Sequence, residues 1–123
     1  MEINERPVGK VIILDLVGRM TVSDGDQLYR DKIYSLVHQG QTSLIVNLRH
    51  LSYIDSGGLG ALVASYTTIS RAGGRLGLVN LTKGIRSLLT ITKLLTVFNT
   101  YASEEEALQS FGVNVSVRSE ETV

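Results

Sequence analysis

The stretch Ile54-Asp55-Ser56-Gly57-Gly58-Leu59-Gly60 joins two segments of different periodicity in this chain of 123 residues. Before it, the apolar run Leu44–Leu48 is typical of a strand that is covered on both faces. After it, the pattern predicts a helix from Gly57 to Ala72 that ends at Gly73-Gly74. The apolar side chains of this helix fall on one side, and they are Leu59, Leu62, Val63, Tyr66 and Ile69.

The same alternation of short apolar runs and amphipathic segments extends over the rest of the chain. Further strands are expected at about 1–6, 11–17, 76–80 and 97–101. Further helices are expected at about 23–38, 83–92 and 104–111. The first has Ser23 or Asp24 as its N-cap, and the last has a capping box of Ser103 and Glu106. The alternation predicts an α/β domain with a largely parallel sheet.

The length suits a single domain, which we place at residues 1–112. Residues 113–123 are expected to form a C-terminal tail or a short edge strand, because Val113, Val115 and Val117 alternate with polar residues. No apolar stretch is long enough for membrane insertion, and the N-terminus lacks signal-peptide features. We therefore expect a cytoplasmic protein.

Charge and composition exclude several classes of function. Lys plus Arg number 12 and Asp plus Glu number 12, and a nucleic-acid-binding protein would need a basic surplus. Cysteine is absent, which removes disulfides and thiolate metal sites. The spacing of His, Asp and Glu predicts no metal site, and no phosphate-binding loop is present. We expect no cofactor.

Ser56 lies where the second helix begins, and its hydroxyl is the feature of greatest interest. A helix N-terminus favours negative charge, so a phosphate on Ser56 would be stabilised there. Gly57 and Gly58 leave the backbone bare, which would let an active site in a second protein reach the hydroxyl. The alternative is that Asp55 and Ser56 are only helix caps, each worth about 1 kcal/mol.

One face of the same helix carries only small side chains. They are Gly57, Ala61, Ala64, Ser65 and Thr68. A smooth face allows close approach of another surface, which is either another part of this domain or a partner protein. We favour a partner, because few helices are available to cover two sheet faces.

A serine nucleophile is the enzymatic alternative, since Asp-Ser-Gly-Gly also surrounds the nucleophile of trypsin-like proteases. Such a serine needs a base and an orienting acid. The two histidines, His38 and His50, lie in no recognisable catalytic setting, and the α/β pattern does not suit that fold. We conclude that the protein is not an enzyme.

With these residues in hand, nearly the whole chain resembles the STAS domain of bacterial anti-sigma factor antagonists and sulfate transporter tails. The motifs that carry the resemblance are Gly18-Arg19-Met20-Thr21, Leu44–Leu48, Leu51-Ser52-Tyr53-Ile54, Asp55–Gly60, Gly73-Gly74, Leu94–Phe98 and Glu105–Leu108. The resemblance implies a mixed, largely parallel sheet of four to five strands, backed by about four helices on one side.

The resemblance also implies a function in transcription regulation by partner switching. An anti-sigma factor that is a serine kinase would bind the unphosphorylated protein, releasing its sigma factor, and would phosphorylate Ser56. A metal-dependent serine phosphatase would reverse this, and a second copy of the chain is a further candidate partner. The alternative is a scaffold subunit, without phosphorylation, in a signalling complex or membrane transporter.

Two positions depart from the family pattern. Thr21 stands where many antagonists have Asp, so Ser23 and Asp24 are expected to take over part of the contact, while Asp55 orients the loop. Gly57 replaces a second Ser or Thr, which leaves Ser56 as the phosphate acceptor. The residues that we expect at the partner interface are Thr21, Ser23, Asp24, Asp55, Ser56, Gly57, Gly58 and Ala61.

Overall fold

The computed structural model describes residues 1–113 and confirms the alternating α/β order. The strands are β1 (Glu2–Val8), β2 (Val11–Met20), β3 (Ser43–Ile54), β4 (Arg75–Val79) and β5 (Asn99–Tyr101). The helices are α1 (Asp26–His38), α2 (Ser56–Arg71), α3 (Lys83–Ile91) and α4 (Glu104–Ser110). Most of the predicted tail or edge strand lies outside the described residues.

The five strands form one mixed sheet in the order β1-β2-β3-β4-β5. A tight turn with Gly9 at φ 60° joins β1 and β2, which pair antiparallel. The other neighbours pair in parallel, as connections through helices require. The predicted mixed, largely parallel sheet with four helices is confirmed.

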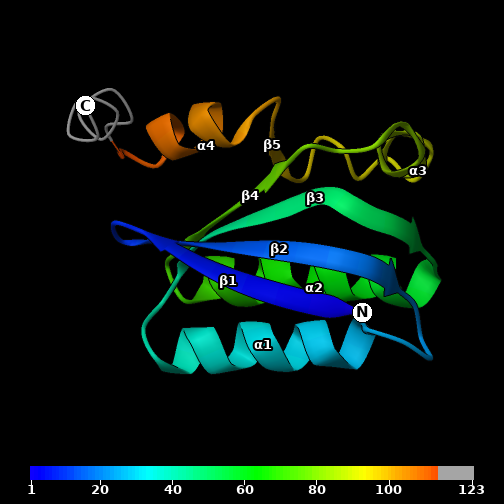
Figure 1. Cartoon of the computed structure of the whole chain (residues 1–123), viewed down its shortest axis with the longest axis horizontal. Coiled ribbons are helices and arrows are strands. Elements are labelled where there is room, and N and C mark those ends of the chain that lie inside the picture. Colours follow the sequence, from blue (N-terminus) through cyan, green and yellow to red (C-terminus); the bar gives the residue numbers. More distant parts are fainter. Residues whose placement is uncertain (114–123) are drawn as a thin grey trace.

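Helices cover both faces of this sheet. Figure 1 shows α1 and α2 side by side below it and α4 above it. The main core lies under β2, β3 and β4 and includes Ile85 and Leu89 of α3. A smaller core on the opposite face packs Ala107 and Leu108 of α4 against the sheet. The implied arrangement of helices on one side is therefore wrong for α4.

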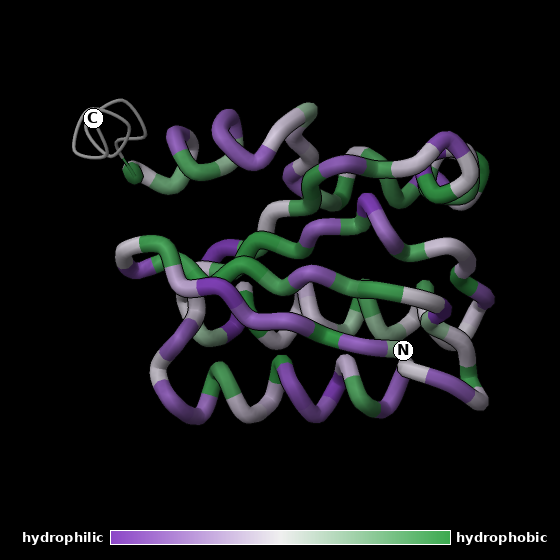
Figure 2. Tube along the Cα trace, in the orientation of Figure 1, coloured by the Kyte–Doolittle hydropathy of each residue, from purple (hydrophilic) through white to green (hydrophobic). Residues whose placement is uncertain are grey.

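Hydrophobicity follows this layering along the chain. Figure 2 shows hydrophobic segments in the central strands, whereas β1 is mostly hydrophilic and α1 alternates between the two. The edge position of β1 explains its polarity, since only β2 pairs with it. Among residues 1–113, no helix combines the length and the apolar composition needed to cross a membrane.

Two strands are longer than predicted. β2 continues to Met20 and β3 to Ile54, and these two residues are paired. The register shifts twice along β2, which disrupts the simple alternation of buried and exposed positions that identifies a strand in sequence. The extension matters for function, because it carries both strands to the loop that holds Ser56.

Of the two N-caps predicted from the sequence, the one at α4 is confirmed and the one at α1 is wrong. Ser103 caps α4 by accepting the N–H of Glu106, as predicted, although the Glu106 carboxylate accepts from Ala102 rather than from Ser103. By contrast, α1 begins at Asp26 behind Gly25, which has φ 98° and supplies no side-chain cap. Neither Ser23 nor Asp24 caps α1, because both belong to the preceding loop.

Candidate functional site

The β2–α1 loop and the start of α2 lie next to each other because their parent strands are neighbours. Met20 and Ile54 are paired in parallel, so the chain leaves both strands at the same edge of the sheet. Figure 1 shows both departures at the end of the molecule that holds the N-terminus of α2. The carboxyl edge of a parallel sheet is a common place for functional residues.

Asp55 holds these two segments together. It is the N-cap of α2, and its Oδ1 accepts the N–H of Gly58 at 2.9 Å. Its Oδ2 accepts the N–H of Val22, in the β2–α1 loop, at 3.1 Å. The N–H groups of Gly58 and then of Val22 lower the pKa of the Asp55 carboxyl below its usual value. The side chain that sequence analysis assigned to loop orientation therefore has a clear structural role.

Ser56 follows as the first residue of α2 and is exposed. Its hydroxyl makes no hydrogen bond to another side chain or to the backbone within residues 1–113. The N–H groups of the first turn have no preceding carbonyl inside the helix to bond, and they create a positive potential there. An oxygen nucleophile at this place is accessible to a second protein, and an anion on it would be stabilised.

Gly57 and Gly58 have a different role from the one predicted. A Cβ on Gly58 would lie 2.0 Å from the carbonyl oxygen of Met20, and one on Gly57 would lie 2.2 Å from Val22 Cγ2. Gly58 is buried and Gly57 is half-buried. The two glycines let the helix start pack against the end of β2 and its loop, and the buried Gly58 does not bare its backbone to a partner.

Thr21 is also a structural residue in this conformation. It is 6% exposed, and its Oγ1 accepts the N–H of Asp24 at 3.1 Å. The side chain closes the β2–α1 loop rather than facing a partner. Ser23 and Asp24 are exposed in the same loop, and Asp24 pairs with the amino group of Met1 at 2.8 Å.

The centre of the small-residue face of α2 is covered by α1, which corrects the predicted docking face at Ala61 and Ser65, whereas Thr68 is exposed. Ala61 is 0% exposed and Ser65 is 3% exposed. The hydroxyl of Tyr29, from α1, donates to Ser65 Oγ at 2.8 Å, and burial raises the pKa of Tyr29. Ala61 therefore lies outside any surface patch, because small side chains here allow two helices of one domain to approach closely.

Two exposed apolar side chains were not predicted from the sequence: Val22, which packs against the start of α2, and Tyr53, near the end of β3. Val22 is 67% exposed and Tyr53 is 51% exposed. The guanidinium of Arg19 lies 5.2 Å from the centre of the Tyr53 ring. The sequence did contain a sign that Val22 is exposed, since it is an apolar residue between Thr21 and Ser23 in a loop. We define the Ser56 surface as the exposed residues Val22, Ser23, Asp24 and Ser56.

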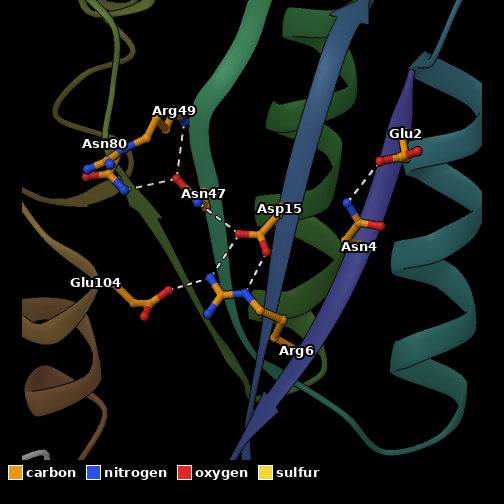
Figure 3. Close-up of polar contacts among 8 residues, drawn as sticks. All are labelled: Glu2, Asn4, Arg6, Asp15, Asn47, Arg49, Asn80 and Glu104. Atoms are coloured by element: carbon orange, nitrogen blue, oxygen red, sulfur yellow. Dashed lines mark hydrogen bonds and ion pairs between the residues drawn. The ribbon is translucent and has the colours of Figure 1, made fainter.

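A separate polar cleft lies on the α4 face of the sheet. Its volume is about 630 Å³. Figure 3 shows Asp15 at its centre, where it accepts hydrogen bonds from Arg6 and from Asn47, the latter at 2.8 Å. Arg6 also pairs with Glu104, which ties α4 to β1. The polar groups satisfy one another, so we assign this network to the fold.

The two histidines have no catalytic arrangement with Ser56. His50 lies on β3 and lines the polar cleft together with Asp15. His38 lies in the last turn of α1, with its ring centre 4.2 Å from that of Tyr34. In the described part of the chain, no three His, Asp or Glu side chains gather as metal ligands.

Comparison with known proteins identifies similar chains. A family model described as STAS domain matches residues 2–107. The anti-sigma-B factor antagonist of Bacillus subtilis (strain 168) is 33% identical over 98 residues, which cover 80% of this chain and 88% of that protein.

Two solved structures have the same fold. A Thermotoga maritima protein, provisionally assigned as an anti-sigma factor antagonist, gives a TM-score of 0.83 at 23% identity and covers 88% of this chain and 92% of its own. The Bacillus cell fate determinant SpoIIAA in its phosphorylated form gives a TM-score of 0.71 at 25% identity, over 89% of this chain and 99% of that one.

Proposed function

The chain belongs to the STAS domain family of anti-sigma factor antagonists, and we propose that it binds an anti-sigma factor through the Ser56 surface. The Bacillus subtilis relative is named as an antagonist of an anti-sigma factor, which supports this assignment. The protein acts by holding another protein and not by catalysis. The observation that carries the proposal is the exposed Ser56 at the N-terminus of α2, with the exposed Val22 packed against the same helix start.

Phosphorylation of Ser56 switches this binding off. A phosphate adds about −1.5 to −2 charges next to the Asp55 carboxylate. The helix N-terminus stabilises that charge, so the modified protein stays folded while its docking surface becomes strongly negative. The similarity to a SpoIIAA structure in the phosphorylated form supports this mechanism. The kinase is the anti-sigma factor itself, and a metal-dependent serine phosphatase resets the switch.

The test uses a serine kinase of the anti-sigma type encoded beside this gene. The purified protein is incubated with that kinase and ATP, and its intact mass is measured. We expect the gain of one phosphate in the wild type and in Ser23→Ala, but none in Ser56→Ala. Ser23 is the matched control because it is exposed in the adjacent loop. Phosphorylation of Ser56→Ala would overturn the assignment of the acceptor.

Binding is measured separately by isothermal titration with the same kinase and ADP. Ser56→Asp should bind at least about tenfold more weakly than the wild type, since the introduced carboxylate partly imitates the phosphate. Val22→Ser should also weaken binding, because an exposed apolar contact is lost. Wild-type affinity in Ser56→Asp would argue against the switch.

The second candidate is a scaffold role in a signalling complex or a membrane transporter. The exposed Val22 favours it, because this apolar side chain can contact a partner whether or not Ser56 is modified. Co-purification with a permease or ATPase subunit, together with no phosphate transfer to Ser56, would select this candidate.

A further inference from the structure

The outer side of α3 carries a surface that the proposed function does not use. Two cavities of about 360 Å³ each lie along it, and Thr90 lines both. We define the α3 surface as the exposed residues Lys83, Arg86, Ser87, Thr90, Ile91 and Lys93. Figure 1 places α3 across the molecule from α1.

The charge on this surface has one sign. The chain has no Asp or Glu between Asp55 and Glu104, although its formal net charge is +0. Lys83, Arg86 and Lys93 take part in none of the ion pairs found within residues 1–113. Their charges are therefore available to an acidic partner.

Helix stability does not explain the cation at Lys83, although the C-terminus of α3 favours Lys93. Lys83 is the first residue of α3, where the helix dipole disfavours positive charge. The same protein follows the dipole rule in α4, whose first turn contains Glu104, Glu105 and Glu106. A basic residue at the start of α3 thus works against local stability, which is typical of a binding function.

An apolar side chain lies among these cations. Ile91 is 78% exposed, the most of any large hydrophobic residue within residues 1–113. The opposite side of α3 already buries Ile85 and Leu89 in the main core. Ile91 is therefore an apolar contact beyond what the fold needs, and it lies between Arg86 and Lys93 in sequence.

We propose that the α3 surface binds an acidic segment of a partner protein that also carries apolar side chains. Carboxylates of that segment pair with Lys83, Arg86 and Lys93, and an apolar residue packs against Ile91. Three cations fall short of the clusters of four to eight that attract anionic lipids, so a protein partner fits better than a membrane. This docking is independent of the Ser56 surface.

The experiment follows backbone amide resonances of the full chain by NMR during titration with a synthetic peptide of alternating glutamate and leucine. We expect shifts centred on residues 83–93. The same peptide with glutamine in place of glutamate should bind several-fold more weakly, and binding should weaken as salt is raised. No shift at millimolar peptide, or shifts centred elsewhere, would overturn the proposal.

Charge reversal provides the matched comparison. Arg86→Glu should weaken peptide binding about tenfold, whereas Arg71→Glu, an equal change at an exposed residue of α2, should leave it unchanged. Ile91→Ser should also weaken binding while the amide spectrum shows an intact fold. An equal loss of peptide binding in Arg71→Glu would show that net charge alone causes the effect, and it would overturn the proposed site.

Two further measurements separate other occupants. Vesicles of phosphatidylcholine alone, or mixed equally with phosphatidylglycerol, are sedimented with the protein. Binding to the anionic vesicles that Arg86→Glu abolishes, without peptide binding, would replace the proposal by a membrane contact. Self-association that Arg86→Glu abolishes, measured by analytical ultracentrifugation, would replace it by a contact between copies of this chain.

Discussion

The Asp55 carboxylate accepts the N–H of Val22 across the gap between two loops, at 3.1 Å, while it also caps α2 through Gly58. One side chain thus sets the position of Ser56 relative to the β2–α1 loop. A change at Asp55 should therefore affect both the start of the helix and the shape of the Ser56 surface.

Asp55→Ala should lower the melting temperature and reduce affinity for the anti-sigma partner more than Asp24→Ala does. Asp24 is the matched control because it is an exposed acid in the adjacent loop. The Asp55 pKa is lowered by folding, so its stabilisation is complete above the ordinary pKa of the carboxyl and is lost as the pH falls through the lowered value. Thermal melts of both variants between neutral and acidic pH measure this. The difference in melting temperature between wild type and Asp55→Ala should shrink as the pH falls. A difference that grows on acidification would contradict the role assigned to Asp55.

Gly58→Ala should destabilise the fold by about 1–3 kcal/mol, since its Cβ would meet the Met20 carbonyl oxygen and the backbone must shift. Gly60→Ala, in the same helix, should instead be neutral or stabilising by up to about 1 kcal/mol. A Cβ on Gly60 would lie at ordinary contact distance, 3.5 Å, from the end of the Arg30 side chain. Urea denaturation measures the change in the free energy of unfolding for both variants. Equal changes would contradict the close approach of the Met20 carbonyl to Gly58.

Tyr29 of α1 and Ser65 of α2 form a buried hydroxyl pair, and removing one hydroxyl should cost more stability than removing the other. Ser65→Ala should cost more than Tyr29→Phe, which should cost about 1 kcal/mol. Without Ser65, the buried Tyr29 hydroxyl loses its acceptor, whereas Ser65 still donates to the Leu62 carbonyl at 2.7 Å when the Tyr29 hydroxyl is removed. Urea denaturation of the two single variants and the double variant tests this. The double variant should lose less free energy of unfolding than the sum of the two single losses.

Asp15→Ala should destabilise the protein by about 2 kcal/mol, because Arg6 and Asn47 both lose an acceptor in a half-buried network. Glu5→Ala, which breaks an exposed pair with Lys32, should change stability by less than about 1 kcal/mol. Chemical denaturation at neutral pH compares the two.

The same carboxyl predicts a pH effect. Hydrogen bonding to Arg6 lowers the pKa of Asp15 below its usual value. The stabilisation is therefore present above about pH 4 and is lost on further acidification. Denaturation curves of wild type and Asp15→Ala should converge at low pH, and a constant difference would contradict the ionised network.

Much of the fold was predictable because it depends on local patterns. The periodicity of the apolar residues and the Gly73-Gly74 stop identified the α2 unit within a residue or two. The extensions of β2 and β3 were not predictable, since strand ends depend on pairing with a distant segment and the register shifts hid the pattern.

In the candidate site, too, features that depend on neighbouring residues were predictable, and features that depend on distant contacts were not. The position of Ser56 at a helix start was predicted correctly, because neighbouring residues alone define it. The roles of Gly58 and Ala61 were misjudged, because a small residue has the same appearance in sequence whether it faces a partner or its own domain. Thr21 was misjudged for a similar reason, since only the closed loop shows that its hydroxyl is already bonded.

By itself, the sequence determined the α/β order, the helix start at Ser56 and the charge distribution along the chain, since each depends on residues close in sequence. Only the tertiary structure decided which surfaces remain open. In the tertiary structure α1 covers Ala61 and Ser65 of α2, and Val22 and Ile91 remain exposed. The parallel pairing of β2 and β3 brings Val22 to Asp55. The physical reason is that burial and long-range hydrogen bonding arise from contacts between segments far apart in the chain.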